Sequence, residues 1–491
     1  MNTWLLLLPF LLPFAGVPLT LALRKRRKIQ SVLALGLMLA ALGFTFGLLR
    51  AVLTTAQPVS IQMGLWQAPF GITLTADPLG VFMTLMSQIV LSAGLIYSLG
   101  STEKVVQYPT YHPLFLALAA GLTGAFLTGD LFNLFVFAEI IVISGAVLTA
   151  IADDAYGVEA AYKYFYISTL ASVFFLLGIG SLYIGHGTLN LADLAARIAS
   201  APSAPLTMAG MALLTAAFLI KSAAFPFHFW QPDFHAAAPT PVSAMLSSLV
   251  VKVGVYAFFR MTTLLFPHVQ LLKTLLVVVG VAGVIYGGFG AAGTHNVKRM
   301  LAYSTLAQIG FILVGIGWGT PLALAAALVF TFNHALVKAA MLMLAGAMAS
   351  RAAVKSASFE VVVGVGKHHP FAGALFLLGG MALAGIPPLN GFISKLMIFW
   401  SGVEAAQYIP LLIIGVASIV TLTYVIRSFI RIWFEPNPKA KEKAGDRLLA
   451  PALLVFLSLL LGVWAEPLVA LSQWTAAWLG DPAFYIAAIL R

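Results

Sequence analysis

The sequence contains no cysteine and very little charge. None of its 491 residues is a cysteine, and only 9% are charged. The first absence excludes disulfides, thiolate nucleophiles, iron–sulfur clusters and thiolate zinc sites. The second excludes a soluble protein, because a soluble chain of this length needs far more charge on its surface. With 61% hydrophobic residues, the chain is predicted to be an all-α polytopic membrane protein.

Signatures of bound cofactors are also missing. No pair of the nine histidines has a convincing metal-ligand spacing, and haem and flavin motifs are absent. The glycine-rich stretches lack the strand–turn–helix context of a nucleotide site. We therefore expect no cofactor, no metal and no enzymatic activity. The net charge of +11 is better explained by basic cytoplasmic loops than by nucleic-acid binding.

Hydropathy predicts about fourteen membrane spans, beginning with 3–23 and ending with 449–470. The first span is followed by the basic run RKRRK (24–28), which places that loop in the cytoplasm and the N-terminus outside. Because successive loops lie on alternate sides of the membrane, fourteen spans place 16 of the 27 Lys and Arg residues on the cytoplasmic side. These are residues 24–28, Lys104, Lys298, Arg299, Arg351, Lys355, Lys367 and the basic residues from Arg431 to Arg447. Fourteen is an even number of spans, so the C-terminus is predicted to lie outside, on the same side as the N-terminus.

Six further basic residues lie inside predicted spans at recurring intervals. They pair as Lys163 with Lys338, Lys221 with Lys395, and Lys252 with Arg427, at spacings of 175, 174 and 175 residues. These spacings predict an internal repeat of about 175 residues, and each repeat contains five spans. Because five is an odd number, the second repeat is predicted to be inverted relative to the first. This gives helices 1–3 in 1–110, a repeat of helices 4–8 in 111–267, and a repeat of helices 9–13 in 268–435. A cytoplasmic loop and a last helix occupy 436–491.

Proline and glycine predict that helices 7 and 12 are broken. In KSAAFPFHFWQP, Pro226 follows Lys221, and in MALAGIPPLNGFISKL, Pro387 and Pro388 precede Lys395. A helical proline removes a backbone donor. Irregular backbone at membrane depth is tolerated only inside protein or beside a wet cavity. The alternative interpretation is that each proline only kinks its helix and serves the packing of that helix.

Of the 16 acidic residues, only Glu139 in FNLFVFAEIIVISGAVL falls well inside a predicted span. Each charge at the membrane centre costs about 2.5–3.5 kcal/mol. A carboxylate that ties helices together is the alternative interpretation. A general scaffold residue would more naturally be duplicated in the second repeat, where the equivalent position is near Val314. The pattern therefore favours a functional Glu139.

Lys221, Lys252 and Lys395 lie too deep in the membrane for their ammonium groups to snorkel to the interface. Snorkelling does explain Lys163 and, in part, Lys338. A buried lysine readily loses its proton and regains it when an anion approaches. At 4 Å and an effective dielectric of 20, one ion pair is worth about 4 kcal/mol. Making and breaking a Glu–Lys pair can therefore load and release a proton, which predicts a proton relay.

His334 in NHALVKAAMLML and His228 in FPFHFW are the predicted histidine members of this relay. His334 precedes Lys338 by four residues, on one face of a helix. For either histidine, the alternative is a satisfied buried or interfacial side chain.

Several motifs together resemble the antiporter-like family. They are TGDLFNLFVFAEI, KSAAFPFHFWQPD, AAPTPVSAMLSSLVVKVGVYAFFR, NVKRMLAYSTLAQIG, FNHALVKAA and GIPPLNGFISKL. That family comprises Mrp-type multisubunit cation/proton antiporters, the proton-pumping subunits of respiratory complex I, and membrane-bound hydrogenases. The resemblance covers at least residues 111–435, and TGDLFNLFVFAEI is typical of the Mrp D subunit. One departure is Gln231, where relatives usually have leucine.

The resemblance implies a fourteen-helix fold with two inverted five-helix repeats and broken helices 7 and 12. It also implies a half-membrane proton path through Glu139, Lys221, Lys252 and Lys395. The expected function is proton translocation in a Na⁺ (or K⁺)/H⁺ antiporter of a prokaryotic cell membrane. Expected partners are other subunits, including a homologous one, the exchanged ions and the lipid bilayer. The alternative is a pump module of a redox complex, driven by electron transfer in partner chains.

Overall fold

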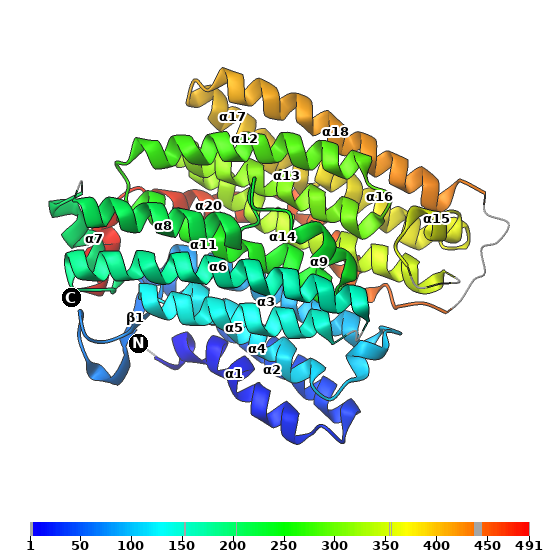
Figure 1. The fold of residues 1–491 in the computed structure, drawn as a ribbon, viewed down its shortest axis with the longest axis horizontal. Helices are drawn as coiled ribbons and strands as arrows, with labels where there is room; N and C mark the ends of the chain where they lie inside the picture. The colour runs from blue at the N-terminus through cyan, green and yellow to red at the C-terminus, as the bar shows by residue number, and fades with distance from the viewer. Residues whose placement is uncertain are drawn as a thin grey trace.

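The computed structural model describes residues 3–151, 154–202, 204–352, 354, 356–436 and 444–490. These residues form a bundle made almost entirely of helices (Figure 1). The fold is therefore a helical polytopic membrane fold, as predicted. Four of the basic residues expected on the cytoplasmic side, Lys355, Lys439, Lys441 and Lys443, lie outside the described residues.

The N-terminal part contains three long helices and a small hairpin. Its elements are α1 (Trp4–Ala22), α2 (Arg27–Thr55), β1 (Val59–Gln62), η1 (Met63–Leu65), β2 (Thr73–Ala76), α3 (Pro78–Leu99) and η2 (Lys104–Gln107). Strands β1 and β2 are antiparallel, with Val59 opposite Ala76. The hairpin was not predicted from the sequence.

The middle of the chain alternates long helices with short ones. Its elements are α4 (Tyr111–Leu127), α5 (Leu131–Ala150), α6 (Ala155–His186), α7 (Leu191–Ser200), α8 (Pro205–Lys221), α9 (Gln231–Ala237), α10 (Thr240–Met245), the π-helical turn η3 (Leu246–Val250), α11 (Val251–Arg260) and the π-helical turn η4 (Met261–Leu265). Segments α10 to η4 together form one membrane-crossing unit.

The remaining elements complete the bundle. They are α12 (Gln270–Gly293), α13 (Val297–Trp318), α14 (Pro321–Arg351), α15 (Phe359–Val362), η5 (Val365–His368), α16 (Pro370–Ala384), α17 (Asn390–Glu404), α18 (Tyr408–Trp433), α19 (Leu449–Val463), α20 (Glu466–Leu479) and α21 (Pro482–Ile489). The predicted last span, 449–470, corresponds to α19 and the start of α20, which are bent by 77°.

Polar residues determine where several helices begin. The side chains of Asp77, Asp130 and Asn296 each accept a backbone N–H from the first turn of the helix that follows. Such caps satisfy donors that have no partner within the helix. At the other end of a helix, Gly385 stops α16 with φ of 85°, a conformation that suits glycine.

Ten helices of the described residues are long and apolar enough to cross a membrane, or eleven if α19 and α20 count as one. Helices α4, α8 and α16 are shorter apolar helices. Both predicted interruptions are present, because α8 ends at Lys221 before α9 begins at Gln231, and α16 ends at Ala384 before α17 begins at Asn390. The number of fourteen spans and their division into inverted repeats remain predictions.

The helices do not recur at the interval of the buried cations. Helix α13 begins at Val297, 166 residues after α5 begins at Leu131, and α14 follows α6 at the same interval. Moreover, Lys221 ends α8 before its interruption, whereas Lys395 lies in α17, after the other interruption. The expectation that spacings of 174–175 residues mark equivalent positions is therefore wrong.

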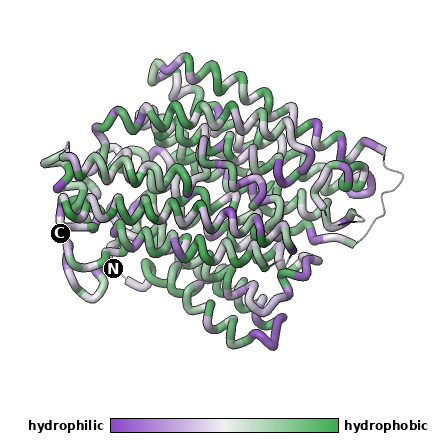
Figure 2. The backbone as a smooth tube through the Cα atoms, viewed as in Figure 1, coloured by the Kyte–Doolittle hydropathy of each residue, from purple (hydrophilic) through white to green (hydrophobic). Residues whose placement is uncertain are grey.

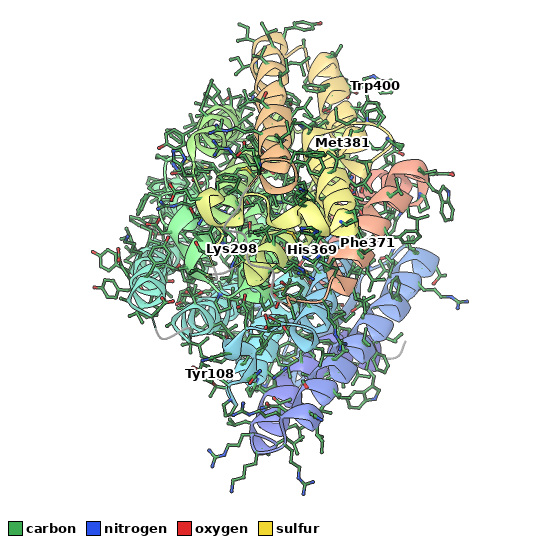
Figure 3. All side chains as sticks on the ribbon, turned by 90° about the vertical axis from the view of Figure 1, so that its right-hand side faces the viewer. Tyr108, Lys298, His369, Phe371, Met381 and Trp400 are labelled. Carbon is green, nitrogen blue, oxygen red and sulfur yellow. The ribbon has the colours of Figure 1, made fainter. Side chains whose placement is uncertain are left out.

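Both termini lie at one end of the bundle, and the α1–α2 turn with residues 24–28 lies at the opposite end (Figure 1). We call this opposite end the basic end. The outer helices are predominantly hydrophobic along their length (Figure 2), as expected for a lipid-facing surface. Figure 3 views the molecule from the basic end and shows Lys298 and His369 there. Which side of the membrane this end faces stays a prediction.

The centre of the bundle is formed by α14 and by the unit from α10 to η4. The apolar windows of both are entirely buried, whereas only 28%, 28% and 22% of those of α1, α2 and α18 are buried. Charged side chains on α11 and α14 are therefore enclosed by protein and do not face lipid.

Candidate functional site

Glu139 and Lys221 form an ion pair between α5 and α8. Lys221 Nζ lies 3.1 Å from Glu139 Oε1 and donates to Ser172 Oγ at 3.2 Å. The Ser172 hydroxyl, from α6, donates to the same carboxylate oxygen. The structure thus brings the two predicted residues together. Ser172 was missed, because a lone serine in an apolar helix is a weak signal in the sequence.

The two members of this pair differ in their surroundings. Lys221 is the last residue of α8, where the helix dipole favours a cation. Its side chain is 8% exposed, whereas that of Glu139 is 29% exposed. Glu139 therefore stands at the edge of the bundle and Lys221 inside it.

Lys252 of α11 meets His334 of α14 at the centre of the bundle. Lys252 Nζ hydrogen-bonds to His334 Nδ1, and both side chains are buried. A contact between these two nitrogens requires one of them to donate and the other to accept. The lysine, as an ammonium or as a neutral amine, can donate to a neutral ring, or a ring N–H can donate to a neutral amine. The contact is therefore suited to hold a single transferable proton.

Lys338 lies one turn beyond His334 on α14 and is fully buried. Its Nζ donates to Ser304 Oγ at 2.8 Å and to the Leu301 carbonyl at 3.1 Å. Tyr424 donates to the same serine hydroxyl at 2.7 Å. In the described part of the chain, no carboxylate lies within ion-pair distance of Lys338.

Lys395 spans the interruption between α16 and α17. Its Nζ donates to the carbonyl of Ala384, the last residue of α16, at 2.8 Å. The ammonium also lies 5.4 Å from the centre of the Phe311 ring. The C-terminal carbonyls of a half-helix attract a cation at membrane depth. The broken helix therefore provides the stabilisation that Lys395 lacks from any described carboxylate.

Two small cavities lie along this row of side chains. One, of about 10 Å³, is lined by Lys221, Ser168 and Val253, the residue after Lys252. The other, also of about 10 Å³, is lined by His334, Gln308 and Lys395. A cavity of this size is close to the space that one water molecule needs. We call Lys221, Lys252, His334 and Lys395 the lysine row. Contacts or a shared cavity link Lys252 to His334 and His334 to Lys395, whereas the first cavity reaches only the neighbour of Lys252.

His228 does not join the row. It lies in the segment between α8 and α9, with its ring centre 4.6 Å from that of Tyr286 and 5.7 Å from that of Phe225. No contact among the described residues links it to a lysine. Its predicted place in the relay therefore gains no support from the geometry.

Sequence reasoning also missed a second buried ion pair. Arg260 is 3% exposed and binds both oxygens of Asp77 at 2.7 and 2.6 Å. Its guanidinium lies 5.1 Å from the ring centre of Tyr256 and 5.0 Å from that of Tyr485. This cluster connects α3, α11 and α21, and no described contact ties it to the lysine row.

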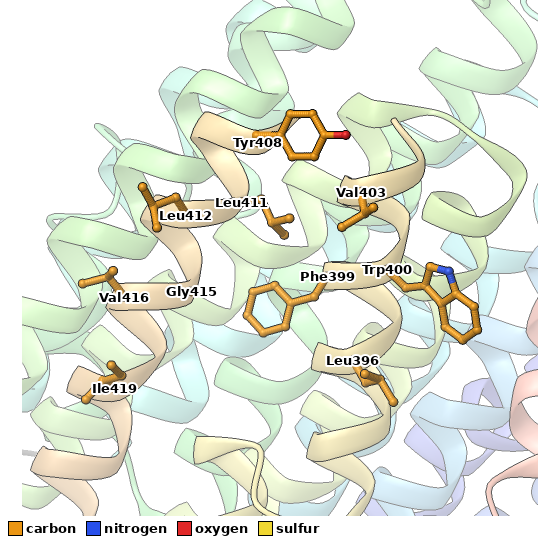
Figure 4. Close-up of a pocket in the computed structure, with 10 residues that line it drawn as sticks. All are labelled: Leu396, Phe399, Trp400, Val403, Tyr408, Leu411, Leu412, Gly415, Val416 and Ile419. Carbon is orange, nitrogen blue, oxygen red and sulfur yellow. The ribbon is translucent and has the colours of Figure 1, made fainter. Parts of the chain in front are cut away.

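A large groove lies between α17 and α18 (Figure 4). It encloses about 880 Å³, and its walls include Phe399, Trp400, Leu412 and Ile419. No charged residue lines it. The groove can therefore hold apolar chains but offers nothing to an ion.

Known proteins of one family match this chain in sequence and in fold. The family described as "NADH:quinone oxidoreductase/Mrp antiporter, TM" matches residues 128–421. The Na⁺/H⁺ antiporter D subunit of Alkalihalophilus pseudofirmus is 31% identical, over 99% of each chain. A chain of the Mrp complex from Dietzia sp. superimposes with a TM-score of 0.91 at 26% identity, over 100% of each chain. A chain of the archaeal membrane-bound sulfane sulfur reductase gives 0.91 at 29% identity, over 99% of each chain.

Proposed function

Because this chain belongs to the NADH:quinone oxidoreductase/Mrp antiporter transmembrane family, we propose that it is a proton-translocating subunit of a multisubunit Na⁺ (or K⁺)/H⁺ antiporter. Relatives named as antiporter D subunits match along their whole length. The observation that carries the proposal is the Glu139–Lys221 ion pair, which begins a row of buried lysines leading to Lys395.

In the proposed mechanism, Glu139 controls the charge of Lys221. While the carboxylate stays within 3.1 Å of Nζ, the ammonium form of Lys221 is stabilised. When the pair opens, burial destabilises that ammonium, and its proton leaves through the adjoining cavity. The Lys252–His334 contact accepts the proton on whichever nitrogen is neutral. Each step moves one proton between two nitrogens and consumes no cofactor.

The second half of the path leads from His334 to Lys395. His334 Nε2 has no hydrogen-bond partner among the described residues, and it lines the second cavity together with Lys395. A water molecule there would connect the two side chains. Lys338, one turn from His334, adds a second buried amine that can store the proton. These roles form our proposal for Glu139, Lys221, Lys252, His334, Lys338 and Lys395.

The position of Glu139 supports the need for partner subunits. An ionised carboxylate that faces lipid is costly, yet 29% of the Glu139 side chain is exposed. Its helix α5 also exposes Val136 and Ile143. We propose that a homologous subunit covers this face, so that the chain works only within a complex. Protons, Na⁺ or K⁺ and the lipid bilayer are the other proposed partners.

A second candidate is a pump module of a redox-driven complex. It is favoured by the match to the archaeal sulfane sulfur reductase, whose TM-score equals that of the Mrp chain. In that case electron transfer in partner chains, not a cation gradient, would drive the same proton path.

One experiment separates the two. The complete complex is placed in everted membrane vesicles, and internal pH is followed after addition of Na⁺ or K⁺, with the respiratory chain inhibited. Antiport predicts proton movement that depends on the added cation. Proton movement only when electron donors are supplied would favour the redox alternative. Subunits encoded by neighbouring genes provide an independent check.

A further inference from the structure

Asn333 of α14 and Asn390 of α17 form a reciprocal pair of buried amides. Asn390 Nδ2 donates to Asn333 Oδ1 at 3.1 Å, and Asn333 Nδ2 donates to the backbone carbonyl of Asn390 at 2.9 Å. The two side chains are 3% and 0% exposed. Buried polar groups that satisfy one another in this way specify a single arrangement of the helices that carry them. We call this pair the amide clasp.

A third helix holds the amide clasp from the other side. Ser458 of α19 donates to Asn390 Oδ1 at 2.6 Å. One turn later on α19, Gly462 lies so close to the segment before α17 that a Cβ there would stand 2.1 Å from the Pro388 carbonyl oxygen. Only glycine permits such a close approach of two backbones. Helices α14, α17 and α19 therefore meet at the clasp, beside the interruption that precedes α17.

The amide clasp adjoins the second cavity of the lysine row. Asn333 and Ser394, whose Oγ lies 3.4 Å from Asn333 Nδ2, line this cavity together with His334 and Lys395. Asn333 directly precedes His334 on α14, and Ser394 directly precedes Lys395 on α17. No hydrogen bond joins His334 to Lys395 in the part of the chain that the structure describes. Their separation is therefore set by the two helices, which the clasp ties together.

The amide clasp differs from the other tie at this interruption. Lys395 bonds to the Ala384 carbonyl through a group that gains and loses a proton. Amide side chains are not among the groups that ionise near neutral pH, so the clasp persists in both charge states of Lys395. The lysine can thus exchange its proton while the helix that carries it stays in place.

We propose that the amide clasp is a positioning device for proton transfer between His334 and Lys395. Asn333, Asn390 and Ser458 hold α14 and α17 at the separation at which one water molecule in the second cavity bridges the two side chains. They do not carry the proton themselves. This inference rests on the proposed function, and it assigns three uncharged residues a role in the rate of that function.

The test uses the complete complex in vesicles. The rate of cation-driven proton movement is measured in H₂O and in D₂O and divided by the amount of assembled complex. Asn390→Leu breaks the clasp and leaves Asn333 Oδ1 without its donor. We expect the rate to fall by roughly 10²-fold, the loss that a displacement of about 1 Å can cause. The solvent isotope effect should increase, because the slowed step is a proton transfer.

A double variant separates positioning from stability. Asn333→Leu with Asn390→Leu removes both amides, so neither is left buried without its partner. The thermal denaturation temperature of the complex should recover relative to Asn390→Leu alone. The rate should stay low and the isotope effect high, because apolar contact does not restore the separation that the amides set.

The matched control is Gln88→Leu. Gln88 of α3 is a fully buried amide whose hydrogen bonds among the described residues reach only α1, α2 and α4. This variant should lose stability but keep the parental rate per assembled complex and the parental isotope effect.

Recovery of the parental rate by the double variant would overturn the inference. Failure of the double variant to assemble would do the same, because either result assigns the pair to stability alone. An equal loss of rate in Gln88→Leu and Asn390→Leu would also contradict it. If the parent complex shows no cation-dependent proton movement, the proposed function itself fails.

Discussion

The ammonium of Lys395 in α17 donates a hydrogen bond of 2.8 Å to the carbonyl of Ala384, the last residue of α16. The contact closes the interruption of the helix with the one side chain there that can exchange a proton. A lysine at this position can therefore hold the broken helix together when charged and loosen it when neutral.

Lys395→Arg separates these two roles. Arginine keeps the charge and can still donate to the Ala384 carbonyl, but it does not release its proton at neutral pH. We expect normal assembly and a transport rate lowered by roughly 10²-fold. Lys395→Met should assemble less well and transport equally poorly. Parental transport by the arginine variant would restrict Lys395 to an electrostatic role.

Ser172→Ala removes the hydroxyl that joins Glu139 to Lys221. The direct ion pair remains, so the loss should be limited to a hydrogen bond to a charged group, about 1.5–3 kcal/mol. We expect transport to fall by about tenfold or more without loss of assembly. Thr169→Ala is the control, because Thr169 lies on an exposed part of the same helix and bonds only to the Phe165 carbonyl among the described residues. Equal effects of the two substitutions would argue against a role for Ser172.

Asp77→Ala leaves the buried guanidinium of Arg260 without its carboxylate. Breaking such a pair from one side typically costs about 3–5 kcal/mol. The thermal denaturation temperature of the purified complex should fall clearly. A double variant, Asp77→Ala with Arg260→Met, should recover part of the loss, because no charge is left unpaired. If the double variant is less stable than Asp77→Ala, the pair does not act as described.

Tags on the two termini should be accessible from the same side of the membrane, and a tag in the turn at 24–28 from the other side. The reason is that both termini share one end of the bundle and this turn lies at the opposite end (Figure 1). Accessibility of the two termini from opposite faces would require an odd number of spans.

The sequence predicted the residues that are costly to bury but not the contacts between distant ones. Glu139 and Lys221 were selected because a membrane penalises charge, and they are paired. Arg260 was not singled out, because nothing local shows that Asp77, 183 residues away, reaches it. The cation spacing also misled the assignment of equivalent positions, since Lys221 and Lys395 lie on opposite sides of their helix interruptions.

The sequence signals for α9 were incomplete. Gln231 was noted as a departure from relatives, but His235 was not singled out, although both side chains are buried. The spacing of four residues between them was the available signal. It could not be used, because the helical stretch they share is only seven residues long and follows an irregular segment.

Purified single chain in liposomes should show no robust antiport. In our proposal, a partner covers the exposed edge at Glu139 and completes the path. The complete complex, reconstituted in parallel, is the positive control. Robust cation-driven proton movement by the single chain would contradict the proposal that partners are required.

The most direct test of the central claim is Glu139→Gln, measured as proton movement in vesicles after addition of Na⁺ or K⁺, with assembly of the complex checked in parallel. Glutamine keeps size and hydrogen bonding, so the helix should still insert, and more easily than with a charge. Lys221 loses its anion and stays neutral more of the time. We predict normal assembly with little or no transport, and intermediate transport for Glu139→Asp. A glutamine variant that assembles and transports at the parental rate would show that Glu139 is structural and that the proposed switch is wrong.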